Sequence, residues 1–261
     1  MLLAIDVGNT QTHLGAFDGD RLVEHWRFQT RAGASGDELA ERISGLLSLS
    51  GLDFSALDAV IVSSVVPPLA GEYEAMTARY LDSAGFLAVG PGVRTGMPIR
   101  IDNPYEVGAD RLVNAVAAYE RFGGACVVVD FGTGINFDVV SADGEYLGGA
   151  IAPGVEISLS ALAERGARIP RIELARPDAA VGKSTRAAIQ SGVIFGFAGL
   201  VDRIADRIAA ELGPGTRLIA TGGLASAIVP FCKSIDEVDD LLTLTGLRLI
   251  WERNRNSSEA L

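Results

Sequence analysis

The sequence predicts an α/β fold made of two duplicated domains, each a mixed β-sheet flanked by helices. One observation is a repeated motif: "IDVGNT" at residues 5–10 and "VDFGTG" at residues 129–134 both carry an apolar strand into an aspartate and a glycine turn. The two aspartates, Asp6 and Asp130, lie 124 residues apart, which is too long for a solenoid repeat and suits a small domain. The length of 261 residues leaves room for two such domains, each with its own core.

The first half begins with apolar and alternating segments that predict an antiparallel meander of three strands. A helix with an apolar stripe ends at Gly51, and the continuously apolar "DAVIVSSVV" predicts a covered strand. Pro67 and Pro68 open another helix, and Gly123 with Gly124 stops the last one. The expected elements are strands at 2–7, 12–18, 22–30, 58–66 and 86–89, and helices at 36–51, 67–84 and within 103–124.

The same order of elements restarts after Gly124. A second meander is expected over 126–154, followed by a strand in "RLIATGGLA" at residues 217–225. Helices are expected near 155–165, 184–212 and 238–254. Since no linker rich in proline, serine or charge separates the halves, we expect the boundary near the end of the helix before Gly123, giving domains at residues 1–121 and 122–261.

Composition narrows the class of partner. The formal net charge is -11 and the pI is near 4.7, so nucleic acid and anionic membrane surfaces would be repelled on average. No run is expected to approach the ~20 apolar residues of a membrane span. Cys126 and Cys232 are expected to be reduced thiols, and the N-terminus lacks the basic region of a signal peptide. These features predict a cytoplasmic protein.

The twin turns suggest phosphate binding. A glycine turn brings backbone N–H groups close to a ligand, and successive N–H groups can hold phosphate oxygens, while an aspartate at the strand end can hold a cation. Two such turns, one per domain, could grip a polyphosphate. The alternative is that Gly8 and Gly132 only form tight turns that the aspartates cap.

A family resemblance rests on seven segments in order along nearly the whole chain: "DVGNT" (6–10), "VVPPL" (65–69), "NPYEVGADR" (103–111), "VVDFGT" (128–133), "YLGGAIAPG" (146–154), "GKST" (182–185) and "ATGGLA" (220–225). Together they resemble type III pantothenate kinase, within the actin, Hsp70 and sugar kinase superfamily. The resemblance implies two actin-like (ribonuclease H-like) domains around an interdomain cleft. It also implies ATP-dependent phosphorylation of pantothenate to 4'-phosphopantothenate, the first step of coenzyme A biosynthesis.

The same resemblance implies site residues and partners. It implies a homodimer whose second subunit helps cover the pantothenate pocket, Mg²⁺ with the ATP, and a monovalent cation (K⁺ or NH₄⁺) held at Asp130. Asp110 is implied as the catalytic base. The implied ATP-binding residues are Asp6, Val7, Gly8, Asn9, Thr10, Gln11, Thr12, His13 and Thr133. The implied pantothenate-binding residues are Tyr105, Gly108, Ala109, Asp110, Arg111 and Thr185.

Several of these residues also have plain structural interpretations. Asp110 stands at a helix start, where a carboxylate can cap the helix instead of accepting a proton from an alcohol. Arg111 suits the carboxylate of an anionic substrate but could equally be a solvated helix residue. Tyr105 could pack behind Pro104, and Thr185 or its neighbour could cap a helix. "GKST" lacks the glycine spacing and preceding strand of a P-loop.

One departure from the family pattern keeps alternatives open. After "DFGT" the family usually has Ala-Thr-Thr or a close variant, and here it is Gly134-Ile135-Asn136. The alternative from another class is therefore a nucleotide-binding regulatory or degenerate homologue with little turnover. A kinase acting on a sugar or polyphosphate is disfavoured by the "NPYEVGADR" block, and an actin-like filament subunit by the short length.

Overall fold

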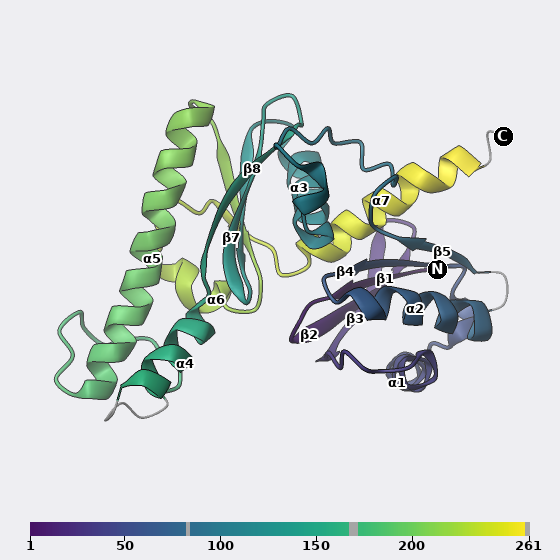
Figure 1. Ribbon diagram of the computed structural model, residues 1–261, viewed down its shortest axis with the longest axis horizontal. Coiled ribbons are helices and arrows are strands. Elements are labelled where there is room, and N and C mark those ends of the chain that lie inside the picture. Colours follow the sequence, from purple (N-terminus) through teal and green to yellow (C-terminus); the bar gives the residue numbers. More distant parts are fainter. Residues whose placement is uncertain (82–83, 167–171, 259–261) are drawn as a thin grey trace. The chain divides into compact units, whose positions relative to one another are not determined.

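The computed structural model describes residues 1–81, 84–166 and 172–258, and it divides into two compact units. Unit 1 contains Met1–Met97, Asn103–Ala117 and the C-terminal segment from Leu242, and unit 2 contains Pro98–Asp102 and Ala118–Leu241. Each unit holds one five-stranded sheet (Figure 1). This grouping differs from the boundary expected at residues 121 and 122, which stays a prediction.

The sheet of unit 1 has the order β3-β2-β1-β4-β5. Strands β1, β2 and β3 form the expected antiparallel meander, while β4 and β5 run parallel to β1. The bounds are β1 Leu2–Val7, β2 Gln11–Asp18, β3 Arg21–Gln29, β4 Ala59–Ser64 and β5 Gly85–Ala88.

The sheet of unit 2 has the order β10-β9-β6-β7-β8 and repeats this topology strand for strand. Strands β6, β7 and β8 are antiparallel, and β9 and β10 run parallel to β6. The bounds are β6 Cys126–Phe131, β7 Gly134–Val140, β8 Tyr146–Pro153, β9 Arg217–Thr221 and β10 Glu237–Val238. The predicted duplication of a mixed sheet flanked by helices is therefore confirmed.

Helices α1 (Gly36–Leu49) and α2 (Pro67–Tyr80) cover one face of the first sheet. Their apolar sides bury Leu3, Ile5 and Val7 of β1, which alternate with residues of the opposite face as the pleat requires. Each fully buried aliphatic side chain of this kind contributes roughly 1.5–3 kcal/mol.

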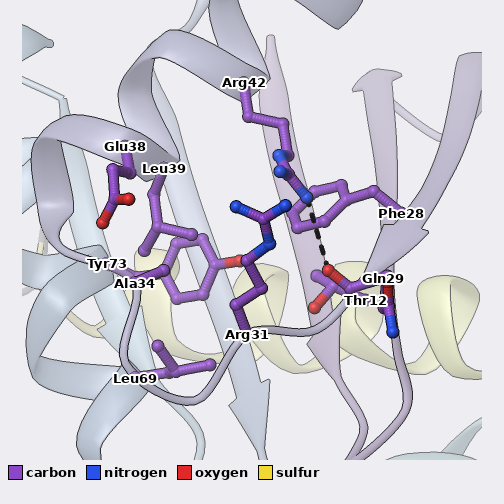
Figure 2. A pocket seen from close by; sticks show the side chains of 10 residues that line it. All are labelled: Thr12, Phe28, Gln29, Arg31, Ala34, Glu38, Leu39, Arg42, Leu69 and Tyr73. Atoms are coloured by element: carbon purple, nitrogen blue, oxygen red, sulfur yellow. Dashed lines mark hydrogen bonds between the residues drawn. The ribbon is translucent and has the colours of Figure 1, made fainter.

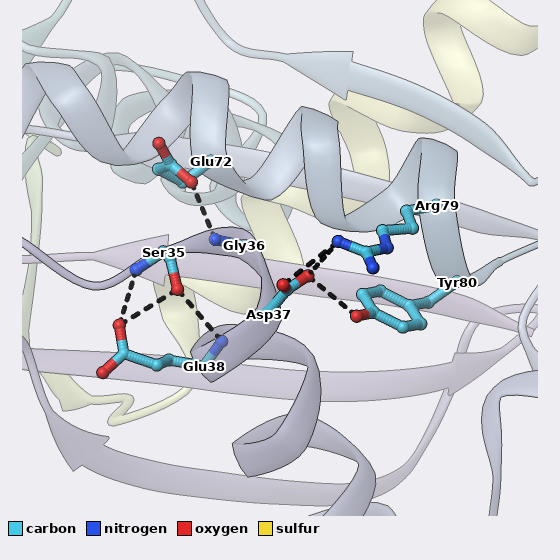
Figure 3. Close-up of polar contacts among 7 residues, drawn as sticks. All are labelled: Ser35, Gly36, Asp37, Glu38, Glu72, Arg79 and Tyr80. Carbon is cyan, nitrogen blue, oxygen red and sulfur yellow. Dashed lines mark hydrogen bonds and ion pairs between the residues drawn. The ribbon is translucent and has the colours of Figure 1, made fainter.

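The start of α1 is fixed by a capping box. The Ser35 hydroxyl accepts from the Glu38 N–H, and the Glu38 carboxylate accepts from the Ser35 N–H at 2.8 Å (Figure 3). Helix α2 adds further contacts, since Glu72 accepts from the Gly36 N–H at 2.7 Å and Arg79 pairs with Asp37 at 2.8 Å. The first turn of α1 is thus held against α2.

Helix α7 (Leu242–Ser258) covers the other face of the same sheet. A Cβ added to Gly15 in β2 would meet Leu244 at 3.0 Å, and one added to Gly85 in β5 would meet Trp251 at 2.8 Å. The helix therefore crosses the sheet from β2 to β5, and the glycines make room for its larger side chains (Figure 1). The expected helix at 238–254 exists, but its first residues form β10 and the turn after it.

Helix α3 (Ala109–Phe122) packs closely against α7. A Cβ on Gly246 would lie 2.2 Å from the Val113 carbonyl oxygen, so only glycine permits this approach. The Thr243 and Asn114 side chains also share a hydrogen bond of 2.7 Å, and Asn114 is buried. The last turn of α3 belongs to unit 2, where Arg121 pairs with Asp239 at 2.8 Å.

Three helices accompany the second sheet: α4 (Val155–Arg165), α5 (Thr185–Leu212) and the short α6 (Ala225–Ile228). Buried residues of α5, such as Ile194 and Val201, pack with Val127 and Val129 of β6. An 18-residue window of α5 has mean hydropathy 1.3, long and apolar enough by length and composition to cross a membrane, with 22% of it buried. The expectation that no segment reaches this threshold is wrong, because glycine, alanine and large aliphatic residues dominate the first half of α5.

Candidate active site

The first turn follows β1 directly. The Gly8 N–H donates to the Gln11 carbonyl at 3.0 Å, and a Cβ on Gly8 would lie 2.9 Å from the same oxygen. Glycine is required here by this close approach, not by an unusual φ. The exposed tip of the turn is Asn9 and Thr10, so its backbone is presented to solvent. An exposed turn of this kind can present backbone amides to a phosphate.

Asp6 lies in a row of polar side chains across the first sheet. Its partner on β2 is His13, whose partner on β3 is Arg27, and its partner on β4 is Ser63. Ser63 is fully buried, and its hydroxyl has no hydrogen-bond partner among the described residues. The sequence signal for Ser63, which was not singled out, is a hydroxyl that interrupts the apolar run of β4 on the side facing Asp6.

His13 is neutral at ordinary pH. Burial, followed by electrostatic interaction with Arg27 and His25, lowers its pKa to about 4. It therefore adds no positive charge to the first turn. The neighbouring residue, Thr12, is 1% exposed, and its hydroxyl shares a hydrogen bond of 2.9 Å with the Thr30 hydroxyl.

Asp110 lies in the first turn of α3 and not at its cap position, since the helix begins at Ala109. Its Oδ1 accepts from the Arg111 N–H at 2.8 Å, and a Cβ on Gly108 would lie 2.5 Å from that oxygen. The missing side chain of Gly108 thus makes room for the carboxylate. Burial raises the pKa of Asp110, and the Arg111 N–H and charge act in the opposite direction.

Tyr105 is 82% exposed in a 3-10 turn, Pro104–Glu106, whose first N–H groups are capped by Asn103. Packing behind Pro104 is therefore not its role. Unit 1 thus carries Tyr105, the block Gly108–Arg111 and the first turn with Asp6 and His13.

The second turn, in unit 2, follows β6. The Gly132 N–H donates to the Gly134 carbonyl at 3.0 Å, and Thr133 at its tip is exposed. A Cβ on Gly222 would lie 2.4 Å from Asp130 Oδ1, and Gly222 has a φ of +95°, which an L side chain rarely adopts. The "ATGGLA" glycine therefore allows the β9 turn to lie against the Asp130 carboxylate.

The departure at residues 134–136 has a clear place in this turn. Ile135 is buried in the second core, and Asn136 is the direct antiparallel partner of Asp130. A Cβ on Gly134 would lie 3.2 Å from the Ala152 carbonyl oxygen, so a larger residue would need a shift of a few tenths of an ångström. The variation thus alters the side chain facing Asp130 and leaves the β6–β7 ladder intact.

Thr185 stands at the start of α5. The cap is made by Ser184, whose hydroxyl accepts from the Ala187 N–H at 3.1 Å, so Thr185 is exposed and is not the cap. Unit 2 thus carries Asp130, Thr133 and Thr185.

No group of three metal-ligating side chains was found in residues 1–81, 84–166 and 172–258. Kinases need no such group for Mg²⁺, which one or two carboxylates hold together with substrate phosphates. Asp6 at the first turn fits this requirement, and the carboxylate of Asp130 with the Asn136 amide across the strand offers the oxygen donors that a monovalent cation takes.

Comparison of the whole fold with solved structures returns proteins of the same architecture. A Campylobacter jejuni protein described as a Baf family transcriptional activator has a TM-score of 0.62 at 20% identity, covering 97% of this chain and 99% of that one. A ROK family protein from Streptococcus pneumoniae, solved with sucrose, has a TM-score of 0.51 at 14% identity over 98% and 99%. At these identities the similarity shows the actin-like fold and nothing further.

Comparison of the sequence is more specific. A type III pantothenate kinase from Anaeromyxobacter sp. (strain K) is 54% identical over 255 residues, covering 98% of this chain and all of that protein. A type III pantothenate kinase from Myxococcus xanthus is 51% identical over 98% of this chain and all of that protein. The sequence profile of type III pantothenate kinases matches residues 2–207. The chain belongs to the type III pantothenate kinase family.

Proposed function

We propose that the protein transfers the γ-phosphoryl group of ATP to the primary hydroxyl of pantothenate, forming 4'-phosphopantothenate and ADP in the first step of coenzyme A biosynthesis. The observation that carries this is the Asp110 carboxylate, which is partly buried and seated against Gly108 within the "GADR" block. Full-length identity of 51–54% to type III pantothenate kinases supports the substrate.

Asp110 acts as the general base. As the pantothenate oxygen attacks phosphorus, its proton passes to a carboxylate oxygen of Asp110, and the bond to the ADP oxygen breaks. Burial raises the pKa of Asp110, which makes it a stronger base than an exposed aspartate. Phosphoryl transfer depends mainly on positioning, so the hydrogen bond from the Arg111 N–H, which fixes the carboxylate, matters as much as its basicity.

The glycine turn of unit 1 is assigned to ATP binding, and the matching turn of unit 2 carries a further assigned residue. In unit 1 the backbone of Gly8, Asn9 and Thr10 holds phosphate oxygens, flanked by Asp6 and Val7 before the turn and by Gln11, Thr12 and His13 after it. In unit 2 the exposed Thr133 takes the same role. Mg²⁺ bound with ATP neutralises part of the phosphate charge, and Asp6 is the residue that would hold it.

A monovalent cation, K⁺ or NH₄⁺, is held at Asp130. The support is the contact between the Asp130 carboxylate and the Gly222 turn, together with Asn136 across the strand. A cation there offsets the negative charge of the Asp130 carboxylate.

Pantothenate is recognised by the exposed Tyr105, by the Gly108–Ala109 backbone and by Arg111, and Thr185 provides a further contact. The guanidinium of Arg111 is matched to the substrate carboxylate. It also counters the average field of a chain with net charge -11, which opposes an anionic substrate.

The homodimer that this pocket requires is supported by large apolar side chains exposed on unit 2. These are Ile151 at 67%, Ile157 at 49%, Leu162 at 41% and Phe195 at 38% exposure, from β8, α4 and α5. Exposed apolar side chains of this size are covered where they gather in an interface. We place the protein in the cytoplasm, where ATP and pantothenate are available.

Dilution to the monomer should abolish activity. Light scattering would report the oligomeric state, and a kinase assay at the same protein concentrations would report the activity.

The function is tested by ADP release with pantothenate against a panel of sugars, each with and without K⁺. Turnover that requires pantothenate, rises with K⁺ and is lost in Asp110→Asn supports the proposal. Tight ATP binding with no turnover on any acceptor would instead identify a nucleotide-binding regulatory homologue. The Gly134-Ile135-Asn136 variation is the reason for considering that alternative.

A further inference from the structure

A small pocket lies inside unit 1, where strands β2 and β3 meet helices α1 and α2 (Figure 2). Its enclosed volume is about 20 Å³, which is room for one water-sized group. The lining residues come from all four elements and the β3–α1 loop: Thr12, Phe28, Gln29, Arg31, Ala34, Glu38, Leu39, Arg42, Leu69 and Tyr73.

The floor of the pocket is a buried hydroxyl. Tyr73 on α2 is 0% exposed, and its oxygen has no hydrogen-bond partner among the described residues. Burial raises the pKa of the Tyr73 phenol, with a smaller opposite effect from the neighbouring Thr12 hydroxyl, so the group stays protonated and can donate. The Thr12 hydroxyl is near enough to affect this pKa but does not meet the geometry of a hydrogen bond to Tyr73. Native proteins seldom leave such a donor without a well-placed acceptor, which points to an acceptor atom entering the pocket.

The mouth of the pocket carries two guanidinium groups, those of Arg31 and Arg42 (Figure 2). Neither forms an ion pair within the part of the chain that the structure describes. Arg42 lies over the Phe28 ring, 5.0 Å from its centre, and donates only a long hydrogen bond of 3.4 Å to the Gln29 carbonyl. Two like charges at one opening repel each other unless an anion lies between them.

The carboxylate that lines the same pocket is engaged elsewhere. Glu38 accepts hydrogen bonds from the backbone and hydroxyl of Ser35, at 2.8 and 3.1 Å, in the capping box of α1. These hydrogen bonds lower the pKa of Glu38 most, and the charges of Arg31 and Arg42 add to the effect. Glu38 thus lies close enough for both arginines to lower its pKa, but its hydrogen bonds go to Ser35 in the helix cap.

We propose that this pocket binds a phosphate group, either free or carried by a small metabolite. One phosphate oxygen enters the pocket and accepts from the Tyr73 hydroxyl, while the outer oxygens accept from Arg31 and Arg42. A phosphate suits the site better than a carboxylate, because after one oxygen enters it still presents enough oxygens and charge for two guanidinium groups.

The pocket is joined to the first turn through two short contacts. The Thr12 hydroxyl, which lines the pocket, shares its hydrogen bond with Thr30, and the Thr30 N–H donates to the Thr10 carbonyl at 2.9 Å. Thr10 is at the tip of the turn to which the nucleotide phosphates are assigned. A phosphate in the pocket therefore alters the affinity of the first turn for nucleotide. By thermodynamic reciprocity, bound nucleotide alters the affinity of the pocket for phosphate by the same factor.

The test is calorimetric titration of inorganic phosphate into the whole chain, with a non-hydrolysable ATP analogue and Mg²⁺ at saturation so that the nucleotide site is filled. We expect one phosphate per chain, with affinity reduced about 10- to 150-fold in Arg31→Gln and in Arg42→Gln. Tyr73→Phe should weaken binding less, since it removes one neutral hydrogen bond. The matched control is Arg21→Gln, an exposed arginine of the same strand region, which should bind phosphate like the parent.

Glycerol phosphate titrated in parallel separates the two sources, because a site for free phosphate rejects the ester and a metabolite site accepts it. Thermal melting of each variant checks that it is folded. Equal phosphate affinity in the parent, Arg31→Gln and Arg42→Gln would overturn the proposal. So would phosphate binding that appears only without the ATP analogue, because that phosphate would occupy the nucleotide turn.

Discussion

Substituting Gly108 by alanine should impair the chemical step without unfolding the protein. The φ of Gly108 is not in the left-handed region, so the backbone accepts alanine. The new Cβ would lie 2.5 Å from Asp110 Oδ1, whereas ordinary contacts begin at 3.4 Å, and the carboxylate must move by about 0.9 Å. That movement weakens the 2.8 Å hydrogen bond from the Arg111 N–H that orients it.

A displacement of about 1 Å at a reacting group can lower the rate about 100-fold. We therefore expect kcat in Gly108→Ala to fall about 100-fold, and kcat in Asp110→Asn to fall about 10²- to 10⁴-fold. Coupled ADP release at saturating pantothenate and ATP measures both. The free energy of unfolding should change by less than about 1 kcal/mol, since the change is confined to the half-buried start of α3 and only one side chain must move.

The control is Gly90→Ala, another glycine of unit 1 with no left-handed φ and nothing within 4 Å of its added Cβ. It should retain the parent kcat. If Gly108→Ala kept the parent kcat and raised only the pantothenate KM, the close approach to Asp110 would have no role in catalysis. Gly108 would then act through its backbone as a binding residue.

Four further outcomes are expected. Arg111→Ala should raise the pantothenate KM about 10- to 150-fold and leave the ATP KM near the parent value, because a charged hydrogen bond is lost; similar increases in both constants would contradict this. Asp130→Asn should blunt the rise of turnover with K⁺, and an undiminished K⁺ response would place the cation elsewhere. Asp6→Asn should weaken use of Mg-ATP at limiting nucleotide, and parent kinetics there would exclude Asp6 from that site. Because the His13 pKa is about 4 in the folded chain against 6.5 when unfolded, the unfolded chain takes up the proton first as pH falls. Thermal stability should therefore decline from about pH 6.5 to 4, and less so in His13→Gln.

Strand and helix identity could be predicted from local sequence because each signal is local. The period of two in β2 and β3, the prolines opening α2 and the glycines after α3 each fix one element without reference to the rest of the chain. The duplicated aspartate and glycine turns added the long-range information, since two matching turns imply two matching sheets.

The place of α7 could not be predicted in this way. Its sequence shows that it is a helix but not which sheet it covers, and adjacency along the chain favoured the second domain. The deciding fact is spatial: Gly15 and Gly85 leave room on the first sheet for Leu244 and Trp251. Neither glycine has a signal that separates it from a glycine in a turn.

In the candidate site, too, some residues could be predicted from local motifs and others only from their neighbours in space. The aspartates and the "GADR" block stand out as motifs, and Gly108 could be related to Asp110 only once the 2.5 Å approach was known. Ser63 and the pair Arg31 and Arg42 carry no motif at all. Their meaning comes from neighbours on other elements, such as Asp6 beside Ser63 and Tyr73 beneath the two arginines.

The position of α7 has a consequence for how the chain is made. Strands β1 and β2 are synthesised early, whereas α7, which covers one of their faces, lies far along the chain at Leu242–Ser258. Until α7 has been synthesised, that face of the nascent sheet is bare apolar surface. The contact that covers it joins segments far apart in sequence, so we expect it to form late in folding.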